Sequence, residues 1–460
     1  MDKAKDSLIK SVNPLTNKVE KVFQVMTQGQ IDQKLSVANE AFQNWRKVPF
    51  EGRANIIHKI ASAFRERKEE MARLCTIEMG KLLKEGITEV SLCADILDYY
   101  ADNGEKFLSD HPLERTNGRA FISYEPLGVI LSIQPWNFPY SQLIRNVAPI
   151  VVSGNTVVVK HASNVPQCAG IVEQIFLEAG APEGVYTNLY IPGSQASQLA
   201  EDSRIKAVTL TGSKPAGSSL ASVAGKNIKK SVLELGGSDP FIVLEDADID
   251  EAVNLAAMGR LRNAGQVCTS PKRIIVVEEI ADEFISKAKA IYENVKIGDP
   301  MEEETQLGPM SSIKQMETVL EQVEKTVNAG AKLVYGGKRL DGDGAFMQPT
   351  ILTGIKPGMV AYSDEIFGPV LCVFPVKDEA EAIRLANDSE FGLGGSVFSR
   401  DEERAIKVAR QINTGMVGIN VVVSSTPQLP FGGTKQSGYG RELSSTGIHE
   451  FVNPKLIRID

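Results

Sequence analysis

The sequence predicts an open α/β fold made of two parallel sheets, each covered by helices. Short apolar runs alternate with helix-patterned stretches from residue 128 to residue 244, and the alternation resumes after residue 268. Strands that alternate with helices form βαβ units, in which the strands lie parallel. The chain of 460 residues also exceeds the length at which a single hydrophobic core stops growing, so more than one domain is expected.

The first part of the chain is predicted to be helical. Between residues 31 and 108, apolar side chains such as Ile57, Ile60 and Phe64 recur at steps of three and four, the period of an amphipathic helix. Residues 119–126 alternate instead, which favours an extended arm. The arm can pair with a neighbouring subunit or with the final extended segment, residues 455–459.

Six apolar runs after the arm are predicted to be strands of one continuing series. They span residues 128–133, 156–160, 185–191, 207–210, 231–234 and 241–244. Such sheets bind ligands at the carboxyl ends of their strands. Beyond residue 268, a second α/β domain is predicted from two strands, 273–277 and 370–374, and two helices, 280–295 and 379–387.

Composition excludes several classes of function. The net charge of −8 argues against nucleic acid or an acidic membrane as the main partner. No apolar run is long enough for a transmembrane helix, and residues 1–8 lack the apolar run of a signal peptide. The five cysteines and four histidines are scattered, so neither a disulfide framework nor a metal site is expected. A cytoplasmic location fits this cysteine usage best.

Three polar residues are candidates for catalysis, each with an ordinary structural alternative. Cys268 lies among small and polar residues before a strand, where it is either a nucleophile or a buried structural thiol. Glu234 ends an apolar strand, and burial there would raise its pKa and suit it to act as a base; a solvated strand end is the alternative. Asn137, between two prolines and two aromatic residues, is either an oxyanion donor or a turn residue.

The segment from Gly212 to Gly217 follows the strand 207–210. It fails as a Walker A loop, because Ser218 stands where the lysine should be. Its backbone N–H groups can nevertheless hold a phosphate at the start of a helix, unless the segment is a plain βα turn.

Together, these motifs resemble the aldehyde dehydrogenase family, in that family's order along the chain. The resemblance rests on Pro-Trp-Asn-Phe-Pro (135–139), Lys160, Gly-Ser (212–213), Glu-Leu-Gly-Gly (234–237), Gly-Gln-Val-Cys (265–268), Glu-Ile-Phe-Gly-Pro (365–369) and Pro-Phe-Gly-Gly (430–433). It covers nearly the whole chain. Within the family the likeness is greatest to bacterial succinate-semialdehyde dehydrogenases, which carry Leu-Gly-Gly-Ser-Asp-Pro, here residues 235–240.

The resemblance implies catalytic roles for the three candidates. Cys268 would attack the aldehyde carbon and form a thiohemiacetal, while the Asn137 side-chain amide and the Cys268 backbone N–H hold the oxyanion. Oxidation would leave a thioester, which water activated by Glu234 hydrolyses. Thr269 and Ser270 follow Cys268, so the second cysteine that forms a redox-switch disulfide in some relatives is absent.

The resemblance also implies a nicotinamide cofactor, with NADP preferred over NAD. Ser163 stands where many NAD-specific relatives carry a glutamate, whose charge would repel a 2′-phosphate by about 4 kcal/mol at a distance of roughly 4 Å and an effective dielectric constant of about 20. The expected cofactor-binding residues are Trp136, Lys160, Ser163, Gly212, Ser213, Gly217, Leu235, Glu365 and Phe367.

Succinate semialdehyde is the expected substrate. Arg145 and Arg262 match positions that hold the distal carboxylate in such enzymes, and a guanidinium fork suits a carboxylate; one of the two could instead form a structural ion pair. Ser425, Thr426 and Phe431 complete the expected substrate site. The alternative function is oxidation of another small aldehyde, neutral or amino-substituted.

The resemblance further implies how the chain is divided. Residues 1–111 and 127–234 would form the cofactor-binding domain, and residues 235–435 the catalytic domain. Residues 112–126 and 436–460 would form the arm, through which subunits assemble into a homodimer or homotetramer.

Overall fold

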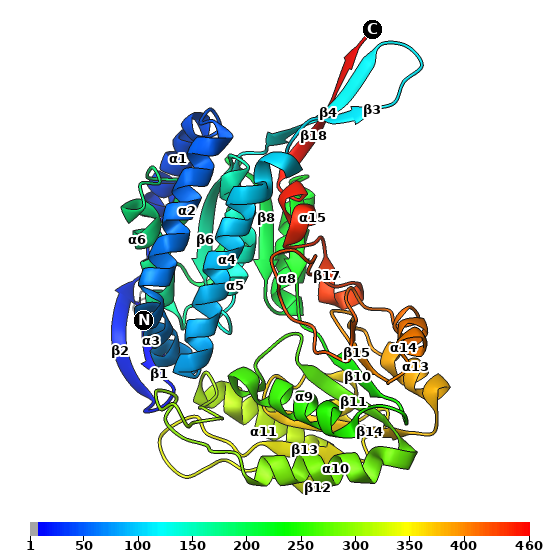
Figure 1. Ribbon diagram of the computed structural model, residues 1–460. Helices are drawn as coiled ribbons and strands as arrows, with labels where there is room; N and C mark the ends of the chain where they lie inside the picture. The colour runs from blue at the N-terminus through cyan, green and yellow to red at the C-terminus, as the bar shows by residue number, and fades with distance from the viewer. Residues whose placement is uncertain (1–7) are drawn as a thin grey trace.

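Figure 1 shows the computed structural model of the protein, which describes residues 8–460. Two lobes, each built on one sheet, carry helices on their faces, and a three-stranded arm projects from one of them (Figure 1). Residues 1–7 are outside the described range, so the expected absence of a signal peptide and the start of the predicted cofactor-binding domain fall there. Among the described residues, none of the helices combines the length and apolar character that a membrane span requires.

The predicted helical region is confirmed as four helices on one lobe. They are α1 (Gln28–Trp45), α2 (Phe50–Glu66), α3 (Lys68–Met79) and α4 (Leu83–Phe107). The side chain of Thr27 caps α1 by accepting a hydrogen bond of 3.3 Å from the backbone N–H of Gln30. Ile57, Ile60 and Phe64 are completely buried, as their helical spacing predicts.

The first sheet has six strands in the order β17-β9-β8-β5-β6-β7. Its parallel strands are β5 (Val129–Gln134), β6 (Thr156–His161), β7 (Tyr186–Asn188), β8 (Ile205–Thr211) and β9 (Lys230–Glu234). These strands confirm five of the six predicted runs, although β7 is shorter than expected. The main helices of this lobe are α5 (Ser141–Val152), α6 (Pro166–Glu178) and α8 (Lys214–Lys226), and the short α7 (Gly193–Ala196) follows β7.

The prediction that residues 241–244 continue this first series was wrong. The strand at this position, β10 (Asp239–Val243), lies between β11 and β15 in the second sheet. Residues 235–238 carry the chain from β9 across to it. Both strands are buried and apolar, so their pattern does not reveal which sheet each one joins.

The second sheet has seven strands in the order β12-β13-β14-β11-β10-β15-β16. They are β10, β11 (Pro271–Val277), β12 (Lys332–Tyr335), β13 (Thr350–Thr353), β14 (Val370–Val376), β15 (Ser396–Phe398) and β16 (Gly418–Ile419), and β12 is antiparallel. The helices of this lobe are α9 (Ile249–Leu261), α10 (Glu278–Glu293), α11 (Ile313–Asn328), α12 (Val360–Ser363), α13 (Glu379–Asn387) and α14 (Glu402–Ala409). This lobe confirms the predicted second α/β unit.

The predicted pairing of the arm with the end of the chain is confirmed within this chain. Strand β4 (Arg119–Pro126) pairs antiparallel with β18 (Val452–Ile459) on one side and with β3 (His111–Leu113) on the other. The range 436–460 also contains β17 (Gly438–Tyr439), which pairs with β9, and α15 (Ser444–His449). The predicted domain boundaries stay a prediction.

An N-terminal hairpin was not predicted. Strands β1 (Leu8–Asn13) and β2 (Lys18–Gln24) pair antiparallel. Most side chains of β2 are exposed, so the strand lacks the buried, alternating apolar face that reveals a strand in a sequence.

Arg260, near the end of α9, is a completely buried cation that ties two loops of the second lobe together. Its guanidinium donates hydrogen bonds to the backbone carbonyls of Gly265 (3.2 Å) and Ile366 (2.5 Å). It also donates to the carbonyls of Val370 (2.7 Å) and Gly368 and to the Ser270 hydroxyl (2.8 Å). These acceptors compensate for burying the charge.

We expect Arg260→Met to lower the free energy of unfolding by about 2–4 kcal/mol, because buried carbonyl oxygens lose their donor. Urea denaturation followed by circular dichroism would measure the change. Arg384→Met is a matched control, since this arginine is exposed and pairs with Glu381 on the surface of α13, where an ion pair contributes less than about 1 kcal/mol. Equal losses in both variants would contradict the structural role of Arg260.

Candidate active site

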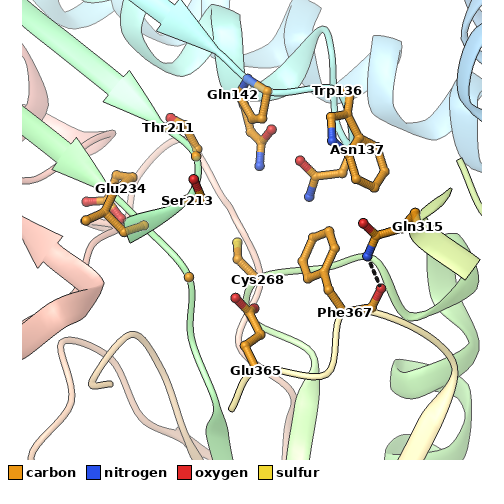
Figure 2. A pocket seen from close by; sticks show the side chains of 14 residues that line it. Trp136, Asn137, Gln142, Thr211, Ser213, Glu234, Cys268, Gln315, Glu365 and Phe367 are labelled. Atoms are coloured by element: carbon orange, nitrogen blue, oxygen red, sulfur yellow. Dashed lines mark hydrogen bonds between the residues drawn. The ribbon is translucent and has the colours of Figure 1, made fainter. Parts of the chain in front are cut away.

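Cys268 lies where two cavities meet. The first cavity, of about 270 Å³, is shown in Figure 2. It is lined by Pro135, Trp136, Asn137, Gln142, Thr211, Gly212, Ser213, Glu234, Leu235, Gly236, Cys268, Gln315, Glu365 and Phe367. The second, of about 60 Å³, is lined by Leu92, Phe138, Ser141, Gln142, Arg145, Arg262, Val267, Cys268, Thr269, Ser424, Ser425 and Phe431. Cys268 and Gln142 face both.

A left-handed turn precedes Cys268. Asn263, Ala264 and Gly265 have φ values of 50°, 52° and 72°, and the first two pay a steric cost for this conformation. The carboxylate of Glu85 accepts the Asn263 backbone N–H at 3.1 Å. Glycine is required at position 265, because a Cβ atom there would lie 2.1 Å from the carbonyl oxygen of Gly368. The turn is therefore fixed at Asn263 by Glu85 and packed at Gly265 against Gly368.

The Cys268 thiol is partly buried among charges of both signs. Burial raises its pKa to about 11, while Arg145 and Lys272 act in the opposite direction. The Lys272 ammonium donates hydrogen bonds to the backbone carbonyls of Val267 (2.8 Å) and Cys268 (2.6 Å). Since the thiolate is the nucleophilic form, attack by this thiol requires a base to take its proton.

The Asn137 side chain is buried and fixed next to the cysteine loop. Its Nδ2 donates to the carbonyl of Gln266 at 2.9 Å, and its backbone carbonyl accepts from Nδ2 of Asn263 at 2.8 Å. An amide nitrogen carries two hydrogens, so one remains for a ligand. Figure 2 shows this amide group facing the same cavity as Gln142 and Cys268.

Glu234, at the end of β9, is 2% exposed. Neither of its carboxylate oxygens has a hydrogen-bond partner within residues 8–460. Burial, reinforced by the negative charge of Glu442 and opposed by Arg145, raises the pKa of Glu234 well above its usual value. A Cβ atom at Gly432 would lie 2.6 Å from Oε1 of Glu234, so a glycine there leaves room for the carboxylate. The expectation of a buried, basic carboxylate agrees with this geometry.

The helix α8 begins at the edge of the first cavity. Ser213 is its N-cap, with an extended backbone and a side chain that does not bond back to the helix. Gly212 and Ser213 line the cavity, so the helix N-terminus can hold an anion there. Gly217 does not line the cavity; a Cβ atom at this position would lie 2.6 Å from Leu235. Gly217 thus allows α8 to pack against Leu235, and Leu235 does line the first cavity.

The opposite wall is formed by the segment 365–369 and Trp136. The rings of Trp136 and Phe367 meet edge to face, with centroids 5.8 Å apart. The Glu365 carboxylate accepts hydrogen bonds from the backbone N–H of Gly237 at 3.3 Å and pairs with Lys272 at 3.1 Å. Four of the predicted cofactor residues, Trp136, Leu235, Glu365 and Phe367, thus share one cavity with Gly212 and Ser213.

Lys160 and Ser163 lie away from this cavity. Lys160, near the end of β6, is 7% exposed, and burial lowers its pKa. Its Nζ lies 3.9 Å from where a Cβ atom at Gly193 would stand. Ser163 is exposed and borders a small separate cavity with His161 and Ile191. The structure therefore does not bring these two residues together with Cys268.

Arg145, which lines the second cavity, has some guanidinium nitrogens bonded within the protein and one without a partner. Its Nε lies 2.6 Å from Oε2 of Glu442, and its Nη1 donates to the Ser425 hydroxyl at 2.9 Å. Its guanidinium stacks 4.1 Å from the Phe431 ring. Its Nη2 is buried without a hydrogen-bond partner among the described residues. The structural ion pair and the carboxylate-binding hypothesis thus both fit this arginine.

Arg262 and Thr426 complete the predicted substrate residues. Arg262 is exposed, its guanidinium lies 5.4 Å from the Phe138 ring, and it lines the second cavity. Thr426 lines neither cavity, although its hydroxyl is buried without a hydrogen-bond partner in the described part of the chain.

The sequence prediction missed several residues that line or support the site. They are Gln142, Thr211, Gln315, Lys272 and Glu442. Gln142 and Arg145 lie three residues apart in α5, so one helix face carries both, and this spacing could have indicated Gln142. Glu442 carries no local signal, because its partners Arg145 and Asn146 are distant in sequence.

Comparisons with known proteins agree with this geometry. The aldehyde dehydrogenase family matches residues 1–457. A succinate-semialdehyde dehydrogenase, NADP(+), of Deinococcus radiodurans is 46% identical over 448 residues, which cover 97% of this chain and 94% of the relative. A succinate semialdehyde dehydrogenase, NAD(P)+, of Escherichia coli K12 is 44% identical over 447 residues, 97% of each chain.

A solved structure is equally similar. The succinic semialdehyde dehydrogenase of Streptococcus pyogenes, in complex with NADP+, has a TM-score of 0.96 and 46% sequence identity, covering 98% of this chain and 99% of the other. The match extends over both sheets and the arm alike. With its motifs, its two-sheet architecture and its full-length relatives in agreement, the chain belongs to the aldehyde dehydrogenase family.

Proposed function

We propose that the protein oxidises succinate semialdehyde to succinate and reduces NADP, with NAD as a second acceptor. The position of Cys268 carries this proposal, because the thiol faces both a cavity suited to a dinucleotide and a cavity lined by two arginines. The relatives named as succinate-semialdehyde dehydrogenases support the choice of substrate. The NADP+ complex of the similar solved structure supports the choice of cofactor.

The residues of the first cavity fit a nicotinamide dinucleotide. Gly212 and Ser213 at the N-terminus of α8 suit the pyrophosphate, and Glu365 suits ribose hydroxyls. The hydroxyl of Thr211 and the amide oxygen of Gln142 are buried without partners among the described residues, as expected of groups that await a ligand. The cofactor, when bound, supplies the two-electron oxidant. Lys160, Ser163, Trp136, Leu235, Gly217 and Phe367 complete the proposed binding region.

The side chains around Cys268 suit acyl chemistry. We propose that Glu234, a carboxylate of raised pKa in the same cavity, takes the proton of the thiol. The sulfur then bonds to the aldehyde carbon, and the oxygen becomes anionic beside the Asn137 amide and the Cys268 backbone N–H. Oxidation of the thiohemiacetal leaves a thioester, and Glu234 releases the thiol proton to solvent. Glu234 then takes a proton from the water that attacks the thioester carbon, and the carbon–sulfur bond breaks to free the carboxylic acid and the Cys268 thiolate.

The second cavity suits a short aldehyde with a distal carboxylate. Arg145 offers its unpartnered Nη2, and Arg262 offers a guanidinium at the rim. The Ser425 hydroxyl and the Phe431 ring hold Arg145 in place. Thr426 would act only after a local movement, because it lines neither cavity.

We also propose that the arm joins subunits into a homodimer or homotetramer. Leu456 and Ile459 of β18 are 61% and 42% exposed, and exposed apolar side chains on a projecting strand favour association. A cytoplasmic location suits the protein, because all five cysteines are free.

Cys268→Ala should abolish aldehyde oxidation and leave NADP binding unchanged, because the alanine removes only the nucleophile. Absorbance of the reduced cofactor measures the first and calorimetric titration the second. Cys372→Ala is the matched control, since that cysteine is buried in β14. Residual dehydrogenase activity above that of a heat-inactivated sample would contradict the assignment.

Arg262→Ala should raise KM for succinate semialdehyde by about 10- to 100-fold, the effect of losing one charge-assisted hydrogen bond of about 1.5–3 kcal/mol. KM for butanal, which has no carboxylate, should stay nearly unchanged. Steady-state kinetics with both aldehydes makes the comparison within one enzyme. Equal increases for the two substrates would instead favour a neutral or amino aldehyde as the natural substrate.

Ser163→Glu should reverse the cofactor preference. A carboxylate roughly 4 Å from the 2′-phosphate repels it by about 4 kcal/mol, which corresponds to about a thousand-fold in kcat/KM with NADP. The kcat/KM with NAD should stay the same or rise. Wild-type kinetics with both cofactors give the baseline, and a wild-type preference for NAD would refute the proposed preference.

A further inference from the structure

Lys272 is a buried ammonium directly behind the cysteine loop. It lies at the start of β11 and is 3% exposed. Its Nζ contacts the carbonyl oxygen of Val267 at 2.8 Å, that of Cys268 at 2.6 Å and the Glu365 carboxylate at 3.1 Å. An ammonium has three hydrogens to donate. All three are thus used on groups that border the reacting thiol.

The bond to Val267 bears on the neighbouring amide hydrogen. The carbonyl of Val267 and the N–H of Cys268 belong to one peptide group, which is trans. In a trans peptide the two groups point in opposite directions. The ammonium, at 2.8 Å, and the longer bond from the Ser270 backbone N–H, at 3.3 Å, hold this oxygen on one side. The Cys268 N–H therefore points to the other side, away from Lys272. A cation on the carbonyl oxygen also polarises the amide and strengthens its N–H as a donor.

We propose that Lys272 is a positioning residue that orients and polarises the Cys268 peptide, so that its N–H stabilises the oxyanion of the substrate. This inference rests on the proposed function, in which that N–H receives the aldehyde oxygen. As the sulfur bonds to the carbonyl carbon, the π electron pair of the carbonyl moves to the oxygen, which becomes anionic. Lys272 contacts no reacting atom and acts through the peptide alone.

The third contact of Lys272, to the Glu365 carboxylate, links the Cys268 loop to the first cavity, where the cofactor is proposed to bind. Glu365 also accepts the Gly237 backbone N–H. A Cβ atom on Gly237 would lie 2.9 Å from Oδ1 of Asp239 and 3.0 Å from the Cys268 carbonyl oxygen. Lys272, Glu365 and Asp239 therefore all lie next to the Cys268 loop. Burial raises the pKa of the Cys268 thiol, the charges of Arg145 and Lys272 lower it, and the charges of Glu365 and Asp239 raise it further. Removing Lys272 should therefore raise the pKa of the Cys268 thiol, and neutralising Glu365 should lower it.

The test compares two reactions of the same thiol. Alkylation by iodoacetamide forms no oxyanion, whereas aldehyde oxidation does. In Lys272→Met, the pH profile of alkylation without cofactor should move to higher pH, since a cation near the thiolate is lost. After correction for the smaller thiolate fraction, kcat/KM for succinate semialdehyde should still fall by about 10- to 100-fold, somewhat less than for loss of a whole oxyanion donor.

Lys229→Met is the matched control. Lys229 also donates to two backbone carbonyls, those of Ala200 at 2.7 Å and Asp202 at 2.6 Å, but at the turn between α8 and β9. This variant should change neither the pH profile of alkylation nor the ratio of the rate of aldehyde oxidation to the rate of alkylation. Lys272→Arg, which keeps the cation, should recover part of the ratio. If Lys272→Met does not fold, Lys272→Gln, a neutral donor, takes its place.

Two results would overturn the inference. One is that oxidation by Lys272→Met falls only in proportion to alkylation, which would leave no oxyanion effect. The other is that Lys229→Met reproduces the extra loss of oxidation, which would make that loss a general effect of removing a lysine bonded to backbone carbonyls. A wild-type enzyme that oxidises butanal but not succinate semialdehyde would refute only the proposed substrate, because the same comparison then holds with butanal.

Discussion

The site depends on the buried guanidinium of Arg260, because this one side chain sets the distance between two loops. The loop before Cys268 is held at Gly265, and the loop that carries Glu365 and Phe367 is held at Ile366. The Arg260 guanidinium is balanced by backbone carbonyls and not by a carboxylate. Burial lowers the pKa of Arg260 from its usual value of 12.5, yet an arginine stays charged at neutral pH. The two cavities can therefore meet at a fixed thiol.

Two charge clusters flank that thiol. On one side, Arg145 pairs with Glu442 next to Glu234. On the other side, Lys272 pairs with Glu365 near Asp239, whose pKa is raised by burial to about 6. Buried ions are tolerated when they are paired, and each cluster holds one carboxylate that is only partly compensated. A fixed field of this kind can stabilise charge changes at the sulfur without reorganisation.

Much of the architecture follows from local patterns. The helical period predicted α1–α4, the apolar runs predicted β5–β9, and the alternation of residues 119–126 predicted the arm. The pattern of β10 alone did not predict its sheet, because a buried apolar strand has the same pattern in either sheet. Only the domain division implied by the family resemblance placed residues 239–243 with the second lobe. Cys268, Glu234 and Asn137 could be named from their motifs. Lys272 and Glu442 could not, since their roles arise from contacts that only the folded chain creates.

The short strand β17 has a consequence for how the enzyme is made. Residues 438–439 return the chain to β9 and bring Glu442 next to Arg145 and Glu234. Glu442 is synthesised long after these partners, and during translation the earlier parts of a chain fold first. A nascent chain that already displays Cys268 therefore has an unpaired Arg145 and an incomplete first sheet. The ion pair of Arg145 and the charge environment of Glu234 are therefore complete only once this late segment docks.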